Sequence, residues 1–157
     1  MTHPFGRALV GVIAVALLAS GCGGGKSDAE KARESGLAKA ADTKTCVAEA
    51  KPADLSSVEP NYPSDFPLPQ GTIAYNAEDR GKDGVIVTAI TKASLKDVLA
   101  TLNGPAQDAG YKVTNGETEA HDAEANWSGK GYRGRWAVKE SATCSGEVVI
   151  QVLSKKG

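Results

Sequence analysis

The chain is poor in the residues that several common protein functions require. It has two histidines, three cysteines and 5% aromatic residues among its 157 positions. After His3, His121 is the only histidine, so Cys46 and Cys144 lack the further ligands that a zinc site needs. The formal net charge is −1, and without a basic excess nucleic-acid binding is not expected. The apolar run 8–19 spans only about 18 Å as a helix, too short for a hydrocarbon core of about 30 Å.

The first 22 residues have the features of an export signal. Arg7 supplies a short positive region, the apolar run 8–19 follows, and small residues precede Cys22. Residues 18–22 (LASGC) resemble the lipobox of bacterial lipoproteins, although Leu18 lies one position further from the cysteine than in the commonest pattern. The resemblance implies cleavage just before Cys22 and a diacylated, palmitate-bearing thiol on that residue. An ordinary cleaved secretory signal is the alternative.

The signal pattern divides the chain into three parts. Residues 1–21 form the predicted signal peptide, and 22–45 form a flexible tether because glycines, charges and small residues leave no wide apolar face. A random coil of that length reaches roughly 25 to 30 Å. Residues 46–157 are predicted to form a single domain. Its lead-in, 52–70, contains five prolines and must therefore be extended.

The cysteines of the exported chain form an even pair once Cys22 carries lipid. Cys46 and Cys144 then remain in an oxidising compartment, where a disulfide is the expected outcome. In the chain-entropy account, closing a loop of this size stabilises the fold by about 4 to 5 kcal/mol. Metal or redox chemistry at these two thiols is the weaker alternative, and no metal site is predicted.

Hydrophobic periodicity predicts an α+β fold. Apolar residues from Leu95 to Ala109 recur every three or four positions, and Ser94 with Asp97 resembles a helix cap. Gly104-Pro105 predicts a kink or a break in this helix near Asn103. The expected domain is a twisted, mainly antiparallel sheet of five to six strands with the kinked helix packed on it, and the four strands after the helix are expected to form a meander. Alternation predicts the strands at 72–76, 85–91, 111–118, 123–127, 132–140 and 146–153.

The same alternation assigns faces to the strands. Trp127, Trp136 and Ile150 are expected to point toward the core with their alternate neighbours, whereas Arg133, Arg135 and Lys139 point the other way. The segment 129–134 has G-x-G-x-x-G spacing, but a strand follows it instead of a helix. A hairpin turn is therefore predicted there, and no cofactor is expected.

Two short sequence segments resemble those of a known group of bacterial lipoprotein domains. The segment 66–71 (FPLPQG), followed by two strands and a helix that ends in 109–111 (AGY), is similar to small uncharacterised domains of bacterial lipoproteins, particularly those of actinobacteria. The resemblance covers about half the chain. It implies a lipid-anchored envelope domain of this fold and brings no catalytic residues.

One stretch offers the minimal ingredients for catalysis. His121 lies in the densest acidic segment, 117–124, and imidazole beside carboxylates supports acid–base chemistry. The candidates are Glu119, His121 and Glu124, in hydrolysis of cell-wall glycan or peptide. A solvated acidic edge is the stronger interpretation, because the chain has no serine nucleophile elbow. No catalytic residue is therefore assigned. Calcium binding by this acidic segment is a weaker option, because the segment lacks the spacing of a calcium loop.

A binding role fits the charge pattern better. Arg133, Arg135 and Lys139 form a basic strand face next to the acidic segment 117–124, and the two sets either pair across strands or leave cations for a partner. The prediction is a non-catalytic binding or accessory domain, lipid-anchored to a cell membrane on its extracytoplasmic side. Its partner would be an envelope protein, an anionic wall polymer or headgroups. A cell-wall hydrolase, or an inhibitor of an envelope enzyme, is the alternative.

Overall fold

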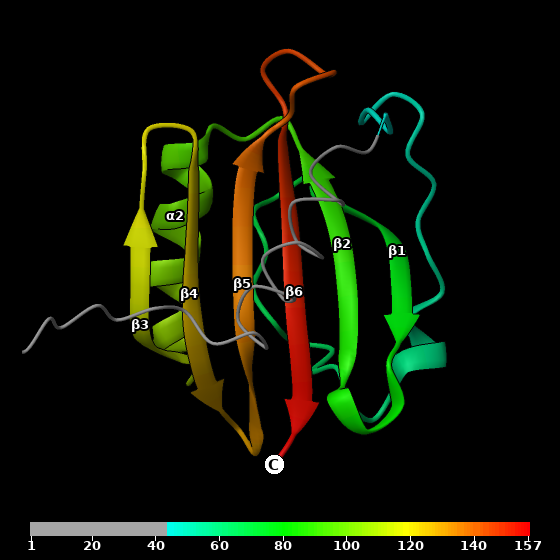
Figure 1. Ribbon diagram of the computed structural model, residues 1–157, viewed down its shortest axis with the longest axis vertical. Helices are drawn as coiled ribbons and strands as arrows, with labels where there is room; N and C mark the ends of the chain where they lie inside the picture. The colour runs from blue at the N-terminus through cyan, green and yellow to red at the C-terminus, as the bar shows by residue number, and fades with distance from the viewer. Residues whose placement is uncertain (1–43) are drawn as a thin grey trace, which may run out of the picture.

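The structure is a computed structural model that describes residues 44–157, which form one six-stranded sheet. All neighbouring strands are antiparallel, in the order β1-β2-β6-β5-β4-β3 (Figure 1). The predicted α+β fold with a helix on an antiparallel sheet is confirmed. The predicted signal peptide, Cys22 and nearly all of the tether lie outside the described residues. The strands are β1 Ile73–Asp79, β2 Val85–Thr91, β3 Lys112–Thr118, β4 Asp122–Gly129, β5 Tyr132–Glu140 and β6 Val148–Lys156.

The four strands after the helix form the predicted meander, β3-β4-β5-β6, and β1 pairs with β2 as a second set of consecutive neighbours. The two sets are joined by β6, which pairs with β2 along seven residues. The chain after β2 crosses the sheet through the helical segment and returns at the far edge, as β3. Val87, Ala89 and Ile150 need neighbours that are buried on the same face, and local alternation does not specify which strand supplies them. Central placement of β2 and β6 supplies them.

The helical segment breaks where the sequence predicts. Helix α2, Leu95–Asn103, begins at Ser94, whose hydroxyl accepts a hydrogen bond from the Asp97 backbone N–H. It ends at Gly104, and Pro105 then occupies the first turn of the short helix α3, Pro105–Asp108. Proline tolerates a first turn because its missing donor has no partner there.

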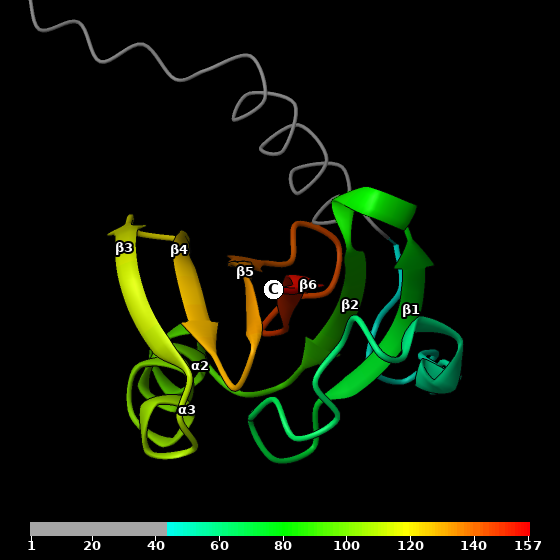
Figure 2. The same ribbon diagram turned by 90° about the horizontal axis from the view of Figure 1, so that it is seen from below.

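One face of the sheet packs against the helices and the proline-rich segment (Figure 2). Val98 and Leu102 of α2 are fully buried, and they join Trp136 and Val138 of β5 in the core. The proline-rich segment, with the 3₁₀ turn η1 (Leu55–Val58), covers the other half of this face. Burying these apolar side chains is the main source of the domain's stability.

An aromatic cluster joins the proline-rich segment to the core. Phe66 lies 4.9 Å from Trp127 and 5.2 Å from Tyr111 between ring centroids, and Tyr62 lies 6.4 Å from Phe66. All four side chains are at least nine-tenths buried. Tilted and edge-on rings at these distances add to area burial. Tyr62 and Phe66 are therefore anchors of the segment, as expected.

The glycine-rich segment 129–134 is the predicted hairpin turn. Lys130 (φ 51°) and Gly131 (φ 80°) form a two-residue connection between β4 and β5. Positive φ at both central residues matches the twist of a hairpin. Gly134 follows on β5 opposite Trp127, and a Cβ there would collide with the Leu153 carbonyl and the Trp127 ring. The glycine spacing is thus explained by the hairpin turn at Gly131 and by the close strand packing at Gly134.

Cys46 and Cys144 lie at bonding distance, with their Cα atoms 5.6 Å apart. Cys46 is near the start of the described chain, and Cys144 is in the β5–β6 connection, 141–147, at the upper end of the sheet in Figure 1. The Val47 backbone N–H also donates to the Glu147 carboxylate, 2.8 Å away. The chain therefore enters the fold at the upper end of the sheet.

Candidate functional site

The sheet face opposite the helices, here called the open face, carries the predicted basic residues. Arg133, Arg135 and Lys139 alternate along β5 with Trp136 and Val138, which point into the core. The orientation of the three cations is thus the predicted one. Their surroundings differ, and these differences decide which of them is available to a partner.

Arg135 is paired with an acidic residue of the neighbouring strand. Its guanidinium forms an ion pair with Glu124 of β4, and the two side chains are 9% and 26% exposed. The pair lies nearly out of solvent, where opposite charges attract more strongly than at a surface. Arg135 therefore belongs to the internal polar network of the open face, as the paired alternative in the sequence pattern allowed.

Lys139 also faces an acid across the strands. It is directly opposite Asp122 in the β4–β5 register, and both side chains are half-buried. Cross-strand partners share a face and lie close, so this carboxylate reduces the local positive potential at Lys139. Of the three predicted cations, only Arg133 has neither an ion pair nor an acid directly opposite: its strand partners are Ser128 of β4 and Lys155 of β6.

Arg133 belongs to a row of cations that crosses four strands. The register pairs Lys155 with Arg133, Arg133 with Ser128, and Ser128 with Lys112, so these side chains share the open face. We call Lys112, Arg133 and Lys155 the basic row. Within residues 44–157 none of the three forms an ion pair, and the Lys155 ammonium donates to the Lys82 carbonyl. Lys112 and Lys155 escaped sequence reasoning because their place beside Arg133 depends on strand pairing.

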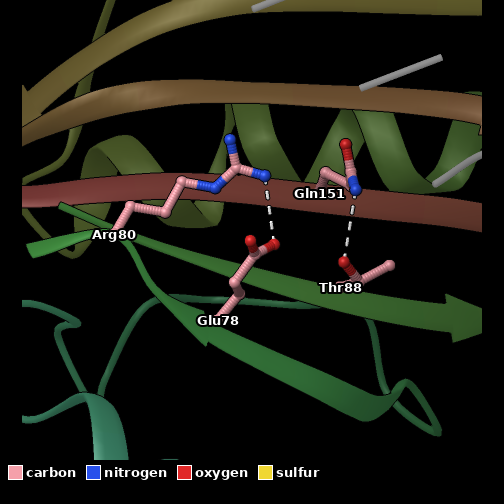
Figure 3. Close-up of polar contacts among 4 residues, drawn as sticks. All are labelled: Glu78, Arg80, Thr88 and Gln151. Atoms are coloured by element: carbon pink, nitrogen blue, oxygen red, sulfur yellow. Dashed lines mark hydrogen bonds and ion pairs between the residues drawn. The ribbon is translucent and has the colours of Figure 1, made fainter. Parts of the chain in front are cut away.

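Two other cations at the same end of the sheet are paired. Arg80 lies 3.1 Å from the Glu78 carboxylate, as Figure 3 shows, and Lys130 contacts Asp65. Figure 3 also shows the Gln151 amide donating to the Thr88 hydroxyl at 3.2 Å between β6 and β2. On the β1–β2 side of the open face the Arg80 charge is therefore paired, and the uncompensated positive charge lies over β6, β5 and β3.

The Lys130 contact is part of a structural cluster. Asp65 accepts hydrogen bonds from the Tyr111 hydroxyl and from Lys130, whose ammonium is 5.1 Å from the centre of the Tyr111 ring. The bonds from Lys130 and Tyr111 lower the pKa of Asp65 below its usual value, while burial and the Asp65 charge raise that of Tyr111. The cluster ties the β4–β5 turn to the proline-rich segment.

The predicted catalytic candidates do not converge. His121 Nδ1 lies 2.8 Å from a Glu140 carboxylate oxygen, with both side chains well exposed, whereas Glu124 contacts Arg135. The Glu119 backbone N–H is bonded to the Asp122 carbonyl in the turn between β3 and β4. His121 and its neighbours thus form a solvated turn at the upper end of the sheet.

Among the described residues, the one cluster with metal-ligand spacing is Cys46, Cys144 and Glu147. Its sulfur atoms are at bonding distance from each other, which removes both as thiolate ligands. Glu147 accepts the Val47 N–H, so its carboxylate already has a structural role.

Comparisons with known proteins found no match among family models, curated proteins or solved structures. In residues 44–157, no helix has the length and apolar character needed to cross a bilayer.

Proposed function

We propose that this protein is a lipid-anchored envelope lipoprotein whose folded domain binds another envelope component without catalysing a reaction. The observation that carries the proposal is the division of the sheet: one face buries the core, and one end of the other face presents the cations of the basic row without acidic partners. The charged residues that resembled a catalytic group are tied to separate structural contacts. The lipobox-like segment 18–22 supports the anchor.

The position of the first described residues suits this role. The chain enters beside Cys46 and the 141–147 connection, which the disulfide joins. A tether that starts at Cys22 would then pull on a cross-linked corner of the domain.

The anchor is tested by expressing the full chain in a bacterium that processes lipoproteins. The expected wild-type product partitions into the detergent phase, and its N-terminal peptide begins at an acylated Cys22. The Cys22→Ser variant should stay unacylated and uncleaved at that site. An unmodified wild-type peptide that begins elsewhere would contradict the proposal and favour an ordinary secretory signal.

A cell-wall hydrolase is the second candidate, supported only by the His121–Glu140 pair. The full chain in mild detergent is incubated with purified peptidoglycan, beside the His121→Ala variant. We expect equal background release of soluble fragments from both. Release by the wild-type chain that the variant loses would favour the hydrolase instead.

A further inference from the structure

We infer that the basic row, Lys112, Arg133 and Lys155, is a docking site for a linear polyanion, a chain with repeated phosphodiester or carboxylate groups. The inference rests on the proposed function, because it places the binding face relative to an N-terminal anchor. It names the chemistry of the partner, which the proposed function leaves open.

Arg133 and Lys155 form a like-charge contact that no acid compensates. They are direct cross-strand partners, a position where two charges of one sign repel. No acid lies opposite Arg133 on its other side, where Ser128 is its partner. An anionic group between the two cations would replace repulsion with two attractive contacts. Lys155 retains N–H donors for this purpose, because its bond to the Lys82 carbonyl uses only one of three.

The second argument is the length of the row. Neighbouring strands are about 4.8 Å apart, so the row extends roughly 14 Å from β6 to β3. A single small anion placed beside Arg133 and Lys155 does not reach Lys112. A chain with charges repeated along its length reaches all three while passing Ser128, an exposed hydroxyl in the row. Arginine can also bind either phosphate or carboxylate oxygens in pairs.

The third argument is the segregation of charge along the strands. The chain has a formal net charge of −1, so its overall charge does not attract a polyanion. The end of the sheet that holds the basic row also carries exposed Lys82 and Lys156 beside two exposed acids, Asp79 and Asp83, whereas the upper end carries a higher concentration of acids. A polyanion is therefore attracted to one end and repelled from the other. The acids of the upper end are Glu117, Glu119, Asp122, Glu140 and Glu147.

The position of the basic row favours a polymer as its ligand over the membrane that would hold the anchor. The chain enters the fold at the acidic upper end, and the basic row lies near the opposite ends of the strands. Strand β6 has nine residues and is about 30 Å long. An anchor that precedes Lys44 therefore attaches to the domain at its acidic end, and the row lies at the strand ends farther from this attachment point. The favoured ligand is a polymer outside the membrane.

The test measures binding of the full chain, purified in a non-ionic detergent, to three probes. These are medium-chain inorganic polyphosphate, polygalacturonate, and nanodiscs of phosphatidylglycerol compared with phosphatidylcholine. The variant Arg133→Glu/Lys155→Glu reverses two charges of the row. The matched control, Lys92→Glu/Lys96→Glu, makes the same change in net charge at exposed positions away from it, one after β2 and one on α2.

We expect wild type and control to bind one or both polymers, and the row variant to bind on the order of tenfold more weakly or worse. Added salt should weaken wild-type binding, because screening acts on exposed charges. Preference for polyphosphate or polygalacturonate identifies phosphate or carboxylate as the recognised group. Urea unfolding of each variant shows whether it retains the fold.

Three results would overturn the inference: no polymer binding by the wild type, equal loss in the row variant and the control, or a loss confined to phosphatidylglycerol nanodiscs. The last result assigns the row to the membrane. If the row variant is unfolded, the single substitutions Arg133→Gln and Lys112→Gln replace it, and unchanged polymer binding in both would contradict the inference. Acylation of Cys22 is measured on the same preparation, so failure of the anchor is recognised separately.

Discussion

Arg135 on β5 and Glu124 on β4 form an ion pair that is almost withdrawn from solvent. The pair divides the basic strand predicted from the sequence: Arg135 belongs to the sheet, and Arg133, two residues earlier, remains exposed beside Lys155. Because only uncompensated cations are available to a partner, this division leaves Arg133, and not Arg135, free to bind one.

Removal of the Glu124 charge should destabilise the fold. Glu124→Gln leaves the largely buried Arg135 guanidinium without this carboxylate, and we expect a loss of about 1 to 3 kcal/mol in the free energy of unfolding. Urea unfolding of the full chain in mild detergent measures it. The control is Glu117→Gln, because Glu117 faces Glu124 across β3 and β4 and repels it. That change should be neutral or stabilising, by at most about 1 kcal/mol; equal losses in both variants would contradict the account.

Asp65 should make stability depend on acidic pH. Its pKa is lowered in the folded protein by hydrogen bonds from Lys130 and Tyr111, so the charged form stabilises the fold above the unfolded pKa. This contribution is lost as the pH falls through the folded value, below the ordinary value of 3.8. Urea midpoints between about pH 2 and 5 should show the loss.

The Asp65→Asn variant isolates this contribution. It should be less stable than wild type at neutral pH, and the difference should shrink as the acid range is entered. Tyr111→Phe removes one of the two donors to Asp65 and should weaken the same pH dependence. A difference between wild type and Asp65→Asn that grows on acidification would show that the sign of the argument is wrong.

Reduction of the Cys46–Cys144 pair should lower stability. The cysteines are 98 positions apart, and constraint of so long a loop corresponds to about 4 to 5 kcal/mol in the chain-entropy account. The unfolding midpoint of the full chain should therefore fall when dithiothreitol is added. Cys46→Ser/Cys144→Ser should match the reduced wild type and be insensitive to the reductant. A reductant effect that persists in this double variant would point to another cause.

Gly134 should not tolerate a side chain. In Gly134→Ala the new methyl group meets the Leu153 carbonyl and the Trp127 ring, and overpacking of this kind costs about 1 to 3 kcal/mol. The matched measurement is Asn126→Ala, an exposed position on β4 that faces Arg135, with an expected change within about 0.5 kcal/mol. Thermal unfolding of both variants tests the contrast. Full wild-type stability in Gly134→Ala would refute the close packing at this strand.

Local sequence patterns predicted the elements and their faces. Alternation placed Trp136 in the core and Arg133 outside it, and Gly104-Pro105 predicted the helix break, because each signal depends on neighbouring residues. The β2–β6 pairing joins residues more than 50 positions apart, such as Ile90 and Val149, and no local pattern specifies it.

The candidate site was predicted only in part for the same reason. The sequence identified the cations of β5. The ion pair of Arg135 with Glu124 and the position of Lys155 beside Arg133, however, depend on strand register. Asp65, Tyr111 and Lys130 meet across long sequence separations, and their contact also escaped prediction. Lys155 lies two residues after Leu153 on β6 and shares its face, so that face was predictable once the strand was extended beyond 153.

The most direct test of the central claim compares the chemical accessibility of Arg133 and Arg135. The full chain in detergent is treated with phenylglyoxal, with and without polyphosphate, and modification of each arginine is followed by peptide mass spectrometry. The account predicts fast modification of Arg133 that polyphosphate suppresses, and slow modification of Arg135 that polyphosphate does not change. Equal reactivity of the two arginines, or an Arg133 that polyphosphate leaves unprotected, would contradict it.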